Sequence, residues 1–140
     1  MIYIGSDHAG FLLKEKIKQI LDKKKIAFED CGTNTLNSVD YPDIAKVVAK
    51  KVKKENTTGI LICKTGIGMS ISANKIKGIR AARVITSTDA KLAREHNDAN
   101  ILTLPGNLTY NAVQKIIDTW VKTKKSAAIR HKRRVKKIEP

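Results

Sequence analysis

The sequence is poor in cysteine, in aromatic residues and in acidic residues, and it contains no long apolar run. No stretch of about 18 consecutive apolar residues occurs, so no membrane-spanning helix is predicted. The two cysteines, Cys31 and Cys63, lack metal-ligand spacing, and we expect neither a metal site nor a disulfide. The first residues read as a strand and not as a signal peptide, so we expect a cytoplasmic protein.

The shortage of acidic residues gives the chain a strong positive charge. It has 28 Lys and Arg against 13 Asp and Glu, a formal net charge of +15. Such a charge would suit a polyanionic partner. However, aromatic residues make up only 4% of the chain, too few for a platform that stacks single-stranded bases. Much of the charge is lysine on the polar faces of predicted helices, for example Lys14, Lys16 and Lys18. We therefore expect a solvated basic surface that attracts an anionic metabolite, and no specific nucleic-acid partner.

What the sequence does contain is a regular alternation of strand-like and helix-like segments. Short apolar runs predict five strands, at 2–5, 26–31, 60–63, 79–84 and 100–104. Amphipathic segments predict the helices between and after them, at 10–24, from about 42, and at 69–75, 88–96 and 109–121. This order predicts one α/β domain over residues 1–140, a three-layer αβα sandwich around a five-stranded, Rossmann-like parallel sheet.

The composition shifts only in the tail, residues 122–140. The tail ends in a basic run from Arg130 to Lys137 and has few apolar residues of its own. Such a segment needs another surface to become ordered, and a partner subunit is a natural candidate. The alternative is a nonspecific basic arm.

The segment with the strongest chemical signal follows the third predicted strand. That strand ends in Cys63, and the sequence continues as Lys64-Thr65-Gly66-Ile67-Gly68-Met69-Ser70. Ligands of parallel α/β sheets bind beyond the carboxyl ends of strands, so we expect Cys63 at the lip of a site and not in the core. Gly66 and Gly68 allow successive backbone N–H groups to face one concavity, which suits an oxyanion or a phosphate. The alternative is a buried structural thiol.

Further titratable residues lie at predicted strand and helix ends. Asp7 and His8 follow the first strand, and His96 and Asn97 end the fourth predicted helix. With Cys63, we expect these groups to gather at one edge of the sheet. The alternatives are that Asp7 only caps a helix and that His96 is an exposed imidazole favoured by the helix dipole.

These motifs together resemble the type B ribose-5-phosphate isomerases, a family that also contains the galactose-6-phosphate isomerase subunits. The resemblance covers essentially the whole chain. The motifs that carry it occur in the same order: Asp7-His8, Asp40-Tyr41-Pro42, Cys63 with Thr65-Gly66-Ile67-Gly68, Asn74-Lys75, Gly78-Ile79-Arg80-Ala81, His96-Asn97-Asp98, and Arg130-His131 with Arg134-Val135.

The resemblance implies an enzyme of the non-oxidative pentose phosphate pathway that interconverts ribose 5-phosphate and ribulose 5-phosphate through a cis-enediolate. It also implies a homodimer or tetramer with active sites shared between subunits, and no metal or nucleotide cofactor. The implied catalytic residues are Cys63, Thr65, His96 and Asp7. The implied substrate-binding residues are His8, Tyr41, Gly66, Ile67, Gly68, Met69, Ser70, Asn97, Arg130 and Arg134.

By the same resemblance, each group has a role. Cys63 would move the proton between C1 and C2, while Thr65 and the loop N–H groups would hold the enediolate oxygen. His96, helped by Asp7, would open the furanose ring. The phosphate would be held by His8, Arg130 and Arg134, and the sugar would contact Asn97 and Tyr41. Paired arginines suit a phosphate because each offers a planar fork of donors.

The chain departs from the family pattern at two places near the site. Lys64 stands where relatives usually have glycine, which either strains a backbone at positive φ by about 1 kcal/mol or leaves an ordinary backbone whose ammonium favours the Cys63 thiolate. We favour the second interpretation. Segment 105–108 lacks the arginine that many relatives place there, and Asn107 offers only a neutral hydrogen bond, so a raised KM is expected.

Two other functions fit parts of the sequence. An isomerase of a six-carbon sugar phosphate, such as allose 6-phosphate or galactose 6-phosphate, would use the same chemistry. The presence of both Cys63 and the arginine pair favours the ribose type over galactose, whereas pocket length would decide allose. The alternative from another functional class is a basic protein that binds a ligand without catalysis. Its binding activity would survive replacement of Cys63.

Overall fold

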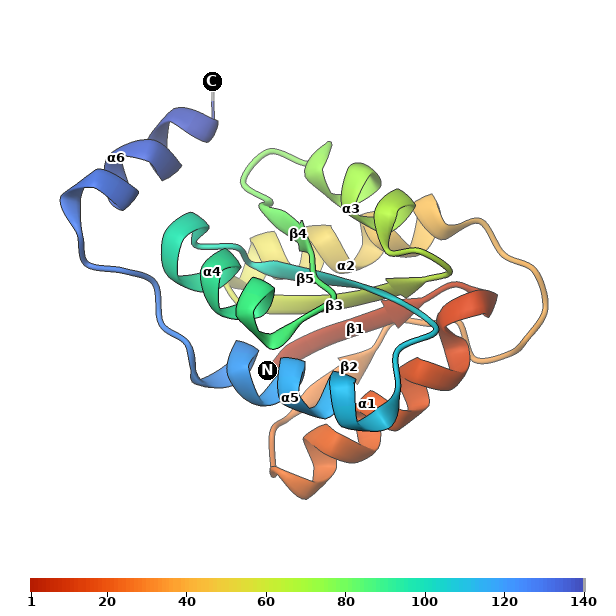
Figure 1. The fold of residues 1–140 in the computed structure, drawn as a ribbon. Helices are drawn as coiled ribbons and strands as arrows, with labels where there is room; N and C mark the ends of the chain where they lie inside the picture. The colour runs from red at the N-terminus through yellow and green to blue at the C-terminus, as the bar shows by residue number, and fades with distance from the viewer. Residues whose placement is uncertain (140) are drawn as a thin grey trace.

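A five-stranded sheet lies between two layers of helices in the computed structural model, which describes residues 1–139 (Figure 1). The sheet has the order β2-β1-β3-β5-β4, and all neighbouring strands are parallel. The strands are β1 (Ile2–Ser6), β2 (Phe28–Asp30), β3 (Thr58–Cys63), β4 (Ala81–Arg83) and β5 (Ile101–Pro105). The predicted three-layer α/β fold is therefore confirmed. We call the side where the strands end the carboxyl edge and the opposite side the amino edge.

The helices follow the predicted alternation closely. They are η1 (His8–Gly10, a 3-10 turn), α1 (Phe11–Lys23), α2 (Tyr41–Glu55), α3 (Ile67–Asn74), α4 (Ser87–Asn97), α5 (Tyr110–Lys122) and α6 (Ile129–Ile138). The largest differences from prediction are in the strands at the two sides of the sheet: β2 and β4 have three residues each, because each has a neighbour on one side only. No helix within residues 1–139 is both long and apolar enough to cross a bilayer.

The core consists of two apolar clusters, one on each face of the sheet. Alternation along β3 directs Ile60 and Ile62 to the cluster under α1, α4 and α5. Leu61 and Cys63 face the other cluster, under α2 and α3. Because both faces are covered, the central strands are apolar at almost every position.

One lysine departs from the expected solvated surface. Lys14 in α1 has a fully buried side chain, and its ammonium forms an ion pair with Asp30 at the end of β2. Lys18 bonds the same carboxylate at 2.8 Å. The expectation that Lys14 lies on a polar helix face is therefore wrong, because Asp30 supplies a partner for a charge on the inner face.

The tail ends in a helix that lies apart from the sheet. A segment without regular structure leads from α5 to α6, which lies beyond the end of α4 (Figure 1). Ile129 and Ile138 of α6 are 80% and 52% exposed. At its far end, the Glu139 carboxylate accepts the N–H of Gly78 at 2.8 Å. Pro140, the last residue of the predicted domain and tail, lies outside the described residues.

Candidate active site

The turn between β3 and α3 places a thiol beside backbone N–H groups. Gly66 is the N-cap of α3 with φ 75°, and a Cβ there would lie 2.9 Å from the carbonyl carbon of Leu104. Only glycine fits both the conformation and the space. The N–H of Gly66 donates to Cys63 Sγ at 3.2 Å, and the N–H of Ile67 donates to Thr65 Oγ1 at 3.2 Å. A donor directed at the sulfur is a favourable contact for a thiolate.

The next two N–H groups of α3 remain free. No side chain caps this helix, and within residues 1–139 the N–H groups of Gly68 and Met69 have no acceptor. They lie at the positive end of the helix dipole. Free N–H groups at a helix N-terminus can donate to an oxyanion, and the oxyanion site at the turn 63–70 stays a prediction.

Cys63 itself is more buried than expected. Its exposed fraction is 5%, and it belongs to the apolar cluster that also contains Tyr3 and Met69. The prediction that it lies outside the core is wrong, because strand alternation points its side chain to the face covered by α2 and α3. It does end its strand at the carboxyl edge, with the Gly66 N–H on its sulfur.

The two interpretations of Lys64 are separated by the backbone. The residues other than glycine at positive φ are Lys25, Asn56 and Asp98, within the described part of the chain. Lys64 is not among them, and its side chain is exposed. Backbone strain is therefore excluded, and the effect of the Lys64 ammonium on Cys63 stays a prediction.

Two predicted residues after β1 reach the same edge. Asp7 is 6% exposed, and its Oδ1 accepts the N–H of Gly10 at 3.1 Å, so it does cap the turn that opens α1. His8 accepts the N–H of Val39 at Nδ1, at 3.2 Å. The neutral ring then has its proton on Nε2, which is left as a donor toward a ligand.

Tyr41 closes this side of the site. It is 39% exposed, and a Cβ on Gly68 would lie 2.6 Å from its Cζ, so the phenol ring rests directly on the α3 turn. Asp7, His8, Tyr41 and Cys63 thus come together at the carboxyl edge from three different loops, together with the N–H groups of the turn 63–70.

His96 and Asn97 lie at the opposite edge of the sheet. They end α4, just before β5 begins, and the carbonyl of Asn100 accepts the N–H of Gly59 at the start of β3. Cys63 instead pairs with Pro105 at the end of β5. Positions 59 and 63 are four residues apart, roughly 13 Å along the strand. The prediction that His96 and Cys63 gather at one edge of the sheet is wrong within a single chain, because α4 runs back antiparallel to the strands.

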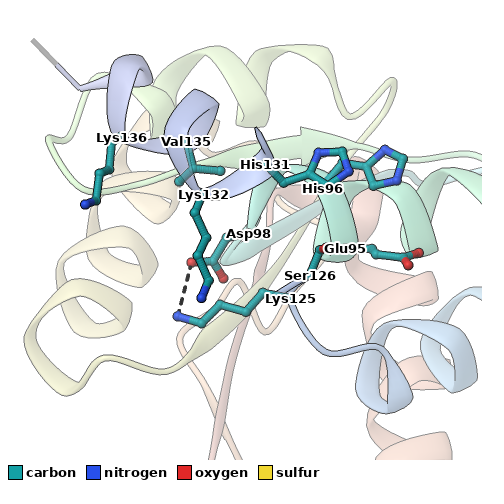
Figure 2. A pocket seen from close by; sticks show the side chains of 9 residues that line it. All are labelled: Glu95, His96, Asp98, Lys125, Ser126, His131, Lys132, Val135 and Lys136. Carbon is teal, nitrogen blue, oxygen red and sulfur yellow. Dashed lines mark ion pairs between the residues drawn. The ribbon is translucent and has the colours of Figure 1, made fainter. Parts of the chain in front are cut away.

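His131 of α6 forms a second cluster with His96 at this amino edge. The two rings stack with centroids 4.2 Å apart and planes 10° from parallel. They line a pocket of about 230 Å³ between α4 and α6, together with Asp98, Lys125 and Lys132 among others (Figure 2). Burial, followed by the charges of His96, Arg130 and Arg134, lowers the pKa of His131. In the sequence, His131 stands out only by its place in the basic tail and in the motif Arg130-His131 with Arg134-Val135.

Asp98 ties the tail to α4. Arg80, Arg94 and Lys125 approach its carboxylate to 3.3, 3.8 and 3.7 Å, and Figure 2 shows the Lys125 contact. One residue further, the N–H of Ser126 donates to the carbonyl of Glu95 at 2.9 Å. The end of α4 and the start of the tail are therefore held together. Arg130 and Arg134 are exposed on α6, at the same edge as His96.

Comparisons with known proteins identify the family and support the fold. A family model described as Ribose/Galactose Isomerase matches residues 2–138. The chain is 46% identical to a ribose-5-P isomerase B of Listeria innocua over 123 residues, covering 86% of this chain and 82% of that protein. A solved ribose 5-phosphate isomerase of Thermotoga maritima superposes with a TM-score of 0.95 at 48% identity, covering 99% of this chain and 96% of the other. The ribose-5-phosphate isomerase B of Mycoplasma genitalium, solved with bound ribulose 5-phosphate, gives 0.92 at 43% identity, covering 98% and 92%.

Proposed function

The chain belongs to the ribose/galactose isomerase family, and on that premise we propose that it interconverts ribose 5-phosphate and ribulose 5-phosphate. The observation that carries the proposal is the Cys63 thiol beside the free N–H groups of the turn 63–70. Moving a proton between C1 and C2 needs a base and a site for the negative charge that develops on oxygen. This turn supplies both.

The roles at the carboxyl edge follow from this chemistry. Cys63 acts as the base, and Thr65 with the N–H groups of Gly68 and Met69 stabilises the enediolate oxygen. His8 donates from Nε2 to the phosphate, and Tyr41 forms one wall of the sugar pocket. The step is a proton transfer within one molecule and requires no redox partner.

The active site is shared between two copies of the chain, as a homodimer or within a tetramer. This proposal rests on the division of the predicted residues between the two edges: Cys63 and His8 at the carboxyl edge, His96 and Arg134 at the amino edge. A second copy that brings its α4 end and α6 to the Cys63 turn supplies the group that opens the ring, Asn97 for the sugar hydroxyls and two guanidinium groups for the phosphate. Docking would also cover the exposed Ile129 and Ile138. We place this activity in the cytoplasm, within the non-oxidative pentose phosphate pathway.

Replacement of Cys63 tests the proposal. We expect Cys63→Ala to lower kcat by about 10²–10⁴-fold, the usual contribution of a positioned acid or base. The matched control is Cys31→Ala, which removes the other free thiol and should retain turnover. Circular dichroism and thermal unfolding of both variants would show that the fold survives.

A parallel assay decides between the five-carbon and the six-carbon substrate. Ribose 5-phosphate and allose 6-phosphate are supplied separately to the wild-type protein, and the turnover of each is measured. Turnover of allose 6-phosphate alone would favour the six-carbon alternative. Absence of turnover on both would contradict the isomerase assignment.

A further inference from the structure

Arg83 contacts the turn 63–70 from β4, two strands away from β3 in the sheet. It ends β4 at the carboxyl edge, its side chain is exposed, and its Nε donates to the carbonyl oxygen of Thr65 at 2.7 Å. The tail arginines lie at the amino edge of the same chain. Arg83 is therefore an arginine that this chain itself brings to the Cys63 turn.

The bond to Thr65 is coupled to the free N–H groups of the turn. In a regular helix the carbonyl of Thr65 would accept the N–H of Met69, four residues ahead. The left-handed conformation of Gly66 turns that carbonyl out of the helix, and Arg83 satisfies it there. The N–H of Met69, in the first turn of α3, has no acceptor in the described part of the chain, and the bond to Arg83 keeps the Thr65 carbonyl from becoming one.

The charged groups around Arg83 leave its guanidinium available. Asp89 is the nearby carboxylate, and its Oδ2 accepts the N–H groups of Ile85 and Thr86. The Ile85 N–H is the main cause of the lowered pKa of Asp89, and the charge of Arg83 adds to it. Within residues 1–139, Arg83 makes no ion pair, and its single hydrogen bond is the one to Thr65.

We propose that Arg83 is a positioning residue of the isomerase. By holding the Thr65 carbonyl away from α3, it keeps the N–H of Met69 free for the enediolate oxygen. This inference rests on the proposed function. The negative charge on that oxygen develops only as the reaction proceeds, so the effect falls on kcat and not on binding.

The sheet order separates this role from phosphate recognition. His8 follows β1, on one side of β3, whereas Arg83 lies on β4, two strands away on the other side. Strands are about 4.8 Å apart, so β4 lies roughly 15 Å from β1, and the Nε of Arg83 is already occupied by the Thr65 carbonyl after β3. Loss of Arg83 should therefore leave affinity for inorganic phosphate unchanged.

Three substitutions at one position test the proposal. Arg83→Met removes the donor, and we expect kcat to fall about tenfold or more, the effect of losing about one hydrogen bond in the transition state. KM and the inhibition constant of inorganic phosphate should stay within about twofold. Arg83→Lys and Arg83→Gln retain an N–H donor and should recover most of kcat. Lys16→Met removes an exposed positive charge from α1 and serves as the charge control.

The outcomes separate the two proposals. An inactive wild-type protein would reject the proposed function itself. An active wild-type protein with Arg83→Met within about twofold of its kcat would overturn the role of Arg83 alone. A rise in KM and in the phosphate inhibition constant at unchanged kcat would also overturn it, because Arg83 would then bind the phosphate.

Discussion

Lys14 is a charged residue in a fully buried environment. Its side chain is completely buried, and its ammonium bonds to Asp30, which also accepts bonds from Lys18 and from the N–H of Gly32. Burial alone would raise the pKa of Asp30, but the hydrogen bonds from the two lysines outweigh it, and the pKa is lowered. The carboxylate is therefore ionised at neutral pH and balances a charge that water cannot reach.

This arrangement predicts unequal costs for removing the two partners. Asp30→Asn removes the nearer carboxylate from the buried ammonium and leaves it only Glu15, at 3.2 Å, so it should lower the free energy of unfolding by up to about 3–5 kcal/mol. Lys14→Met fills the same space with an apolar chain and leaves Asp30 paired with Lys18, so it should cost less than about 2 kcal/mol. Urea unfolding at one fixed protein concentration would measure both. Equal losses, or a larger loss for Lys14→Met, would contradict this account.

At the scale of elements, α6 depends on a contact that titrates. His131 stacks on His96 at the end of α4, and its pKa is lowered by burial first and then by His96, Arg130 and Arg134. A lowered pKa means that the docked helix binds fewer protons than the undocked one. The stabilisation is then fully present above about pH 6.5 and is lost as the pH falls through the lowered pKa.

We therefore expect acid to loosen α6 before the sheet. Amide hydrogen exchange, corrected for its intrinsic pH dependence, should show lower protection of residues 129–138 at about pH 5.5 than at about pH 7.5. In His131→Phe an aromatic ring still stacks on His96, but the ring at position 131 cannot gain a proton. The protection of the α6 amides in this variant should therefore depend less on pH. Protection of α6 that does not change with pH in the wild-type protein would speak against the histidine contact.

The elements also show which parts of the structure were predictable. β3 was predictable because a strand covered on both faces must be apolar throughout, and the N-terminus of α3 because glycines mark the turn before it. The edge at which His96 lies follows from topology and not from a local pattern, because α4 returns antiparallel to the strands. The burial of Lys14 and the bond from Arg83 to Thr65 depend on residues far apart in the sequence, and local patterns do not report such pairs.

At the scale of the whole molecule, the question is how one reaction can use both edges of the sheet. A site that combines Cys63 with His96 requires two chains, since the sheet separates these residues within one. In the proposed homodimer, two identical chains related by a two-fold axis would form two equivalent sites, each with its turn 63–70 from one copy and its α4 end and α6 from the other.

Mixed dimers test this arrangement directly. Cys63→Ala and His96→Asn chains, each inactive as a homodimer, are co-expressed with different affinity tags, and the mixed species is isolated through both tags. One of its two sites then contains intact Cys63 and His96, so we expect about half of the wild-type activity per dimer, because a two-fold dimer holds two equivalent shared sites. If each site were built within a single chain, both sites of the mixed dimer would lack one group, and no activity would return. Since the two variants differ only in which edge they damage, recovery can arise only from a site that joins the carboxyl edge of one copy to the amino edge of the other.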